Sequence, residues 1–140
     1  PGSFRTMQVV YGFGKPGTAF IVPRIRQEGG PPSTSNRTML LRVERGYPLM
    51  PGILYISSKP AWITLNGGLF LLSSERITSL PFLLDAGLSL TPGSAQALVG
   101  LPVPGAGLAG GRVYLQALLI DPGSSYAFSL TPGLALAFPY

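Results

Sequence analysis

The sequence contains no histidine and no cysteine, and it has only five carboxylates among its 140 residues. Histidine, cysteine and paired acidic residues supply most general bases, nucleophiles and metal ligands in proteins. Their scarcity favours a protein that is not an enzyme and needs no cofactor and no metal. The sequence therefore predicts a role in holding a shape or contacting a partner. The five carboxylates are widely separated, at Glu28, Glu44, Glu75, Asp85 and Asp121.

Charged residues are also scarce, at 11% of the chain, which is under half the usual share. Hydrophobic residues make up 46%. A domain of this size buries roughly two-thirds of the surface that its unfolded chain exposes, so some apolar surface should remain outside. Such surface usually marks a contact with another molecule. We expect a homo-oligomer or polymer; the alternative is a monomer with scattered exposed apolar residues.

The positive charge lies mainly in the first 45 residues, which carry seven bases and two acids. A solvated strand face explains this pattern better than a nucleic-acid surface, which would need denser Lys and Arg with interleaved aromatic residues. We predict no nucleic-acid partner. We also predict no membrane span, because no apolar run approaches the ~20 residues of a membrane helix.

Glycine and proline together form nearly a quarter of the chain, and they punctuate short apolar runs. Runs that end at Gly or Pro favour strands. A single short helical turn is expected at Ser94–Val99, with Ser94 as its N-cap and Gly100 as its stop. The expected strands are Phe4–Tyr11, Thr18–Arg26, Arg37–Arg45, Gly52–Ser57, Trp62–Asn66, Leu69–Ser73, Leu80–Leu84, Gly87–Thr91, Arg112–Asp121, Ser125–Thr131 and Leu134–Phe138.

About eleven short strands with regular turns predict an all-β fold. The predicted architecture is a two-sheet antiparallel β-sandwich, jelly-roll or immunoglobulin-like, that forms a single domain over residues 1–140. Arg112–Asp121 is apolar on both faces, which indicates a central strand covered on each side. Gln116 on this strand then needs hydrogen-bond partners.

Three further side chains receive structural roles. Glu44 is expected to form a cross-strand ion pair with an arginine. Asp121 precedes Pro122 and is expected to cap the turn that follows it. Trp62 begins a strand and is expected to pack in the core.

Two segments are candidate sites of modification or exchange. Asn36 begins an N-glycosylation pattern, and the preceding Ser33, Thr34 and Ser35 could carry O-linked sugars in an exposed loop. Residues 1–17 could hold an exchange strand followed by a Gly-rich hinge, although both termini could instead pair within their own domain. The exchange segment would use Phe4, Thr6, Met7, Val9 and Val10.

The chain resembles an uncharacterised β-rich domain of proteins secreted by some large-genome bacteria. The resemblance rests on Tyr11–Gly14, Val22–Ile25, Ala97–Pro104, Val113–Gly123 and Phe128–Leu136. Pro132 stands where that family usually has Asn, and the cysteines often found in its first half are missing. The resemblance implies an exported domain at an extracellular or cell-surface location, and it carries over no catalytic residue.

These features favour a non-catalytic extracellular structural protein that assembles into a filament, sheath or surface layer on a bacterium. Assembly would use apolar sandwich contacts, with possible strand addition at a sheet edge and possible glycans on the surface. The alternative is a carbohydrate-binding accessory module of a secreted protein. That alternative predicts two or three coplanar aromatic rings on one sheet face, whereas a degradative enzyme would need two converging carboxylates.

Overall fold

The fold is all-β, as predicted. The computed structural model describes residues 7–28, 38–57, 59–65, 68–72, 77–102 and 112–137, which contain eleven strands. Among them, no helix is both long and apolar enough to cross a membrane. The strands are β1 (Met7–Tyr11), β2 (Arg24–Glu28), β3 (Thr38–Gly46), β4 (Pro51–Ser57), β5 (Pro60–Leu65), β6 (Gly68–Leu72), β7 (Thr78–Leu83), β8 (Ala95–Pro102), β9 (Arg112–Ile120), β10 (Phe128–Leu130) and β11 (Gly133–Ala137).

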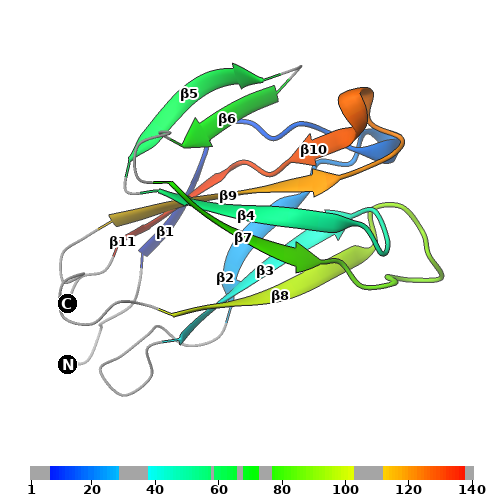
Figure 1. Ribbon diagram of the computed structural model, residues 1–140, viewed down its shortest axis with the longest axis horizontal. Helices are drawn as coiled ribbons and strands as arrows, with labels where there is room; N and C mark the ends of the chain where they lie inside the picture. The colour runs from blue at the N-terminus through cyan, green and yellow to red at the C-terminus, as the bar shows by residue number, and fades with distance from the viewer. Residues whose placement is uncertain are drawn as a thin grey trace.

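The strands form three antiparallel sheets that lie in layers (Figure 1). The largest has the order β1-β11-β9-β4-β7, and β10 also pairs with β9. The sheet β2-β3-β8 covers one face of it, which gives the predicted sandwich. The hairpin β5–β6 lies over the other face as a third layer, which the sequence did not predict.

The main core lies between the large sheet and β2-β3-β8. Leu115, Ala117 and Leu119 alternate along β9 and are fully buried against it. The opposite sheet contributes residues such as Leu41 and Val43, which alternate along β3 in the same way. Each buried leucine contributes about 2 kcal/mol by leaving water. Hydrophobic burial therefore holds these two layers together.

The opposite face of β9 is held by a polar contact. Gln116 is fully buried, and its Oε1 accepts a hydrogen bond of 2.9 Å from the backbone N–H of Leu71 on β6. Its Nε2 donates to the carbonyls of Leu69 and Thr131, each at 2.9 Å. The prediction that Gln116 needs partners is confirmed, and so is the prediction of a central strand with both faces covered. One side chain thus fixes the hairpin to the central strand.

Two predicted strands are wrong because residues in each adopt a positive φ. Thr18–Arg26 begins as a 3-10 turn over Thr18–Phe20, and β2 starts only at Arg24. Gly87–Thr91 forms turns instead of a strand. A left-handed residue departs from the extended backbone and interrupts a regular ladder. In the predicted strand Ser125–Thr131, a 3-10 turn occupies Ser125–Ala127 and only Phe128–Leu130 is extended.

The predicted helical turn at Ser94–Val99 is also wrong, because Ala95–Val99 lies in β8 and Ser94 directly precedes this strand. Ala95, Ala97 and Val99 alternate as buried residues and face the core, so the period is two. Ala95–Val99 pairs with β3 throughout, for example Val99 with Leu41. Pairing between distant segments has overridden the local cap and stop signals.

Replacing Gln116 by leucine should destabilise the protein by about 3 kcal/mol, because three buried backbone groups would lose their partner. Urea unfolding measures the change. The same substitution at Gln96, on β8 near the surface, serves as the control and should change the free energy of unfolding by less than about 0.5 kcal/mol. A Gln116→Leu protein as stable as the control would show that the hairpin is held by other contacts.

Candidate interaction surface

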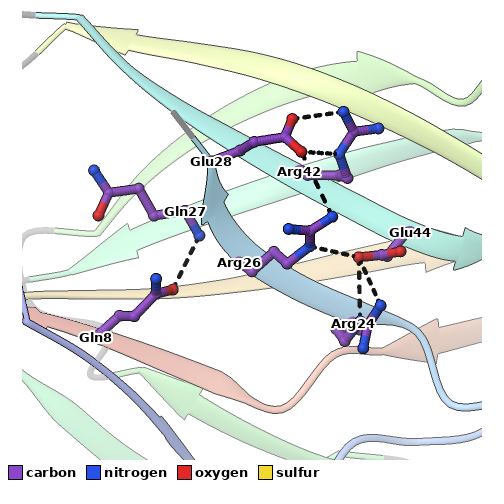
Figure 2. A network of polar contacts seen from close by, with 7 residues as sticks. All are labelled: Gln8, Arg24, Arg26, Gln27, Glu28, Arg42 and Glu44. Atoms are coloured by element: carbon purple, nitrogen blue, oxygen red, sulfur yellow. Dashed lines mark hydrogen bonds and ion pairs between the residues drawn. The ribbon is translucent and has the colours of Figure 1, made fainter. Parts of the chain in front are cut away.

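The outer face of β2 and β3 carries a network of charged side chains (Figure 2). Arg42 binds Glu28 with two hydrogen bonds, the one from Nε to Oε1 being 2.8 Å long. Glu44 Oε1 lies 2.8 Å from Arg26 Nε and 3.0 Å from Arg24 Nη2. The predicted cross-strand pair between Glu44 and an arginine is confirmed. Two glutamates therefore bind three of the arginines in the basic first 45 residues.

These contacts change how the carboxylates titrate. The hydrogen bond from Arg42 is the main reason that the pKa of Glu28 lies below its usual value. Burial acts to raise the pKa of Glu44, but the hydrogen bonds from Arg24 and Arg26 outweigh it and the pKa is lowered. Both glutamates therefore prefer the ionised form in the folded protein.

A buried lysine holds the Gly-rich segment that follows β1. Lys15 is only 2% exposed, and its Nζ donates to Ser124 Oγ at 2.8 Å and to the carbonyls of Ser125 and Phe128 at 2.6 Å. Burial lowers the pKa of Lys15, and the nearby charge of Asp121 opposes this shift. The backbone of Lys15 also pairs with Leu130 in both directions. This part of the predicted hinge is firmly attached, so a hinge would have to lie within Gly12–Gly14.

Asp121 attaches the same segment a few residues further along. Its side chain accepts hydrogen bonds from the backbone N–H of Gly123 at 3.1 Å and of Thr18 at 2.9 Å. The predicted cap of the turn is confirmed, and the bond to Thr18 adds a link between β9 and the distant N-terminal segment. Asp121 is therefore a structural residue in this fold.

The connections at one end of the sandwich carry exposed apolar side chains. Strand pairing brings Pro51 opposite Leu83 and Gly52 opposite Leu119, so the ends of β7 and β9 and the start of β4 meet there. The loops that join the strands at this end of the sandwich lie at the right of Figure 1. We define the apolar loop end by the exposed side chains of Phe20, Leu49, Leu90 and Tyr126.

All four residues of the apolar loop end have a positive φ, between 58° and 61°. This conformation costs a non-glycine residue roughly 1–2 kcal/mol. Backbone hydrogen bonds hold it, such as that from Leu49 N to the carbonyl of Asp85 at 3.0 Å. Phe20 is 91% exposed as a result. The fold thus sustains strained backbone while it presents apolar side chains to water.

The sequence did not single out the apolar loop end. The sequence patterns place Phe20, Leu90 and Tyr126 in predicted strands and give Leu49 no role. The available signal was a large apolar residue isolated in a connection rich in Gly, Pro and Ser, as in Gly46-Tyr-Pro-Leu49. This signal is weak, because it does not show whether the side chain points inward or outward.

The predicted exchange segment is only partly described. Met7–Tyr11 forms β1, which pairs with β11 of the same chain, and Val9 and Val10 are exposed. This is the intramolecular pairing weighed above; exchange between copies stays a prediction. Phe4 and Thr6 lie outside the described residues, and so do the candidate glycosylation residues Ser33, Thr34, Ser35 and Asn36.

The aromatic residues near the β5–β6 hairpin meet edge to face. Trp62 is 60% exposed, so the prediction that it packs in the core is wrong. Its ring lies 5.9 Å from that of Tyr11 at 80°, and Tyr11 meets Tyr114 at 89°. Tyr11 donates a hydrogen bond of 2.7 Å to the carbonyl of Leu71, and burial raises its pKa to about 12. These pairs are perpendicular, unlike the coplanar rings that the carbohydrate-binding alternative predicts.

The described residues contain no group of three or more acidic side chains that could hold a metal ion. Two of the five carboxylates, Asp85 and Asp121, have backbone partners. Asp85 Oδ1 accepts hydrogen bonds from Gly87 N at 2.9 Å and Gln96 N at 3.0 Å. The contacts of Asp121 are those of a turn cap. The exposed apolar side chains are therefore the strongest candidate for a functional surface.

Acid should weaken the fold through the glutamate network. Because the folded-state pKa values of Glu28 and Glu44 are lowered, their contribution is present above the usual value of 4.5 and is lost as the pH falls below it. In urea unfolding, the wild-type protein should lose more stability between pH 7 and pH 3 than a Glu28→Gln, Glu44→Gln protein. Arg45→Gln removes an exposed charge outside the network and should keep the wild-type response. Equal losses in all three proteins would contradict this assignment.

Comparison with known proteins adds no assignment to this surface. No protein-family model, curated protein or solved structure matches the chain. The resemblance to a domain of secreted bacterial proteins therefore stays a prediction. What the surface does has to be argued from its geometry.

Proposed function

We propose that this protein is a non-catalytic structural protein that assembles with copies of itself into a filament, sheath or surface layer outside a bacterial cell. The exposed apolar side chains carry this proposal. Isolated exposed apolar residues are normal on a monomer, but a cluster usually marks a contact. The four residues of the apolar loop end belong to four separate connections that lie at the same end of the sandwich.

Backbone conformation supports the same conclusion. Strained residues in the left-handed region persist only where the surrounding structure fixes their conformation, and they are found frequently at functional sites. A loop that served only to connect strands would reach lower energy with Gly or Asn at these positions. Contact with a second copy would bury Phe20, Leu49, Leu90 and Tyr126 and offset the strain. Assembly thus explains why large apolar side chains occupy these strained and exposed positions.

The N-terminal strand offers a second contact. β1 is an edge strand with no charged residue and no proline, and such an edge can pair with another chain. Val9 and Val10 would then be partly covered. Pairing with a neighbour could either extend the sheet or exchange β1 between copies, with Gly12–Gly14 as the hinge. Contacts at two different places on the molecule would let assembly continue beyond a dimer.

A carbohydrate-binding module is the second candidate, and the exposed ring of Trp62 favours it. One exposed tryptophan can stack on a sugar ring, although the neighbouring rings do not lie in its plane. This candidate predicts a monomer whose tryptophan fluorescence changes when a glycan is added. The two proposals therefore differ in a property that can be measured directly.

Assembly can be tested by replacing three of the four residues of the apolar loop end without relieving their backbone conformation. Phe20→Asn, Leu90→Asn and Tyr126→Asn together replace large apolar side chains with a residue that tolerates a positive φ. The triple variant should fold, and the concentration at which polymers form should rise at least tenfold. Sedimentation velocity and negative-stain imaging over a concentration series measure this threshold.

Ile63→Thr serves as the control, because Ile63 is an exposed apolar residue on β5, away from the loop end. It should leave the threshold unchanged. A wild-type protein that stays monomeric at millimolar concentration and binds a glycan would replace the assembly proposal with the carbohydrate-binding one.

A further inference from the structure

Three of the edge strands in the two main layers differ in how they are protected from pairing with other chains. β7 contains Pro81, which cannot donate a hydrogen bond to a neighbouring strand. β2 carries Arg24, Arg26 and Glu28. β8, by contrast, has neither a charged residue nor a proline before its last residue, Pro102. Charges and prolines on edge strands prevent unwanted pairing, and β8 lacks both.

The direction of the free backbone groups on β8 follows from its first residues. The carbonyl of Gln96 accepts a hydrogen bond of 3.0 Å from Asp85 N, and its N–H donates to Asp85 Oδ1 at 3.0 Å. The backbone of Gln96 therefore points away from β3. Because these groups alternate along a strand, those of Leu98 and Gly100 point the same way. In the described part of the chain, no strand pairs with β8 on that side.

We propose that β8 pairs edge to edge with β8 of a second copy, related by a two-fold axis at Val99. This inference rests on the proposed function and assigns it a specific contact. In an antiparallel ladder centred on Val99, Leu98 lies opposite Gly100 of the second copy, and Gly100 lies opposite its Leu98. Each of these pairs exchanges two backbone hydrogen bonds, about four in total. The sheet β2-β3-β8 would then continue into the same sheet of the second copy.

The side chains on the outer face fit this register. Leu98 is 54% exposed and would lie over Gly100 of the second copy, which has no side chain to obstruct it. Gly100 in turn is the β3 partner of Leu40, which is 41% exposed. The leucine of one copy would therefore reach across the glycine of the other toward Leu40. Two exposed leucines on each copy would become covered.

The lack of charge on β8 favours a second copy as the occupant. A two-fold axis places a strand beside its own sequence, so any charge on the strand comes close to a like charge, which is destabilising. The edge strand β2 would bring arginines together in this way. Ala95–Pro102 contains no charged residue, so β8 meets its own copy without repulsion. Together with the apolar loop end or β1, this contact would give the two kinds of interface that an open polymer needs.

Amide hydrogen exchange followed residue by residue tests the ladder directly. In dilute monomer, the N–H groups of Leu98 and Gly100 should exchange rapidly, whereas those of Ala97 and Val99 are protected by β3. On assembly, the exchange of Leu98 and Gly100 should slow at least tenfold, and that of Val99 should change little. Rapid exchange of Leu98 and Gly100 in assembled protein would overturn the inference.

A matched pair of variants completes the test. Leu98→Lys places a charge at the centre of the proposed contact and, since the residue is exposed, should leave the monomer folded. It should weaken dimerisation at least tenfold in sedimentation experiments. Thr78→Lys places the same charge on an exposed position of β7 and should leave dimerisation unchanged.

The outcomes separate this inference from the proposed function. If the wild-type protein forms polymers and Leu98→Lys forms them equally well, the β8 contact is wrong and assembly stands. If the wild-type protein never associates, both are wrong. If β8 instead becomes protected only when an unrelated peptide is added, the edge binds another partner and self-pairing is wrong.

Discussion

The central strand β9 is the element on which the other layers depend, because both of its faces are used. Leu115, Ala117 and Leu119 face the main core, while Gln116 binds the hairpin β5–β6. The two attachments differ in kind. Hydrophobic packing tolerates small shifts between layers, whereas the amide of Gln116 requires its three partners at fixed positions. The position of the hairpin is therefore set more by the directional hydrogen bonds of Gln116 than by the area of surface that the hairpin buries.

Much of the fold could be predicted from local patterns, and the failures have a common cause. Arg112–Asp121 is apolar on both faces, and this is enough to identify a central strand. At Ser94–Val99 a period of two competes with cap and stop signals, and only the pairing with β3 decides the outcome. The partners of Gln116 are backbone atoms of distant segments, which no local pattern contains.

The candidate surface was harder to predict than the core. Sequence rules reserve the left-handed region mainly for Gly and Asn, so Phe20 and Leu90 are assigned to strands by default. The total excess of apolar surface follows from composition, but its location depends on these unusual conformations. The edge of β8 is likewise invisible until the strand order is known, because the same residues would be paired in the middle of a sheet.

The hydrogen bonds of Lys15 join distant parts of the chain in a β-sandwich that contains no disulfide. The lysine ammonium group joins an N-terminal segment to oxygen atoms of Ser124, Ser125 and Phe128, more than a hundred positions away in the chain. A disulfide closing so long a loop would require an oxidising compartment. A hydrogen-bonded cation needs no oxidant and is unaffected by thiols. The closure that Lys15 provides should therefore be the same on either side of a cell membrane.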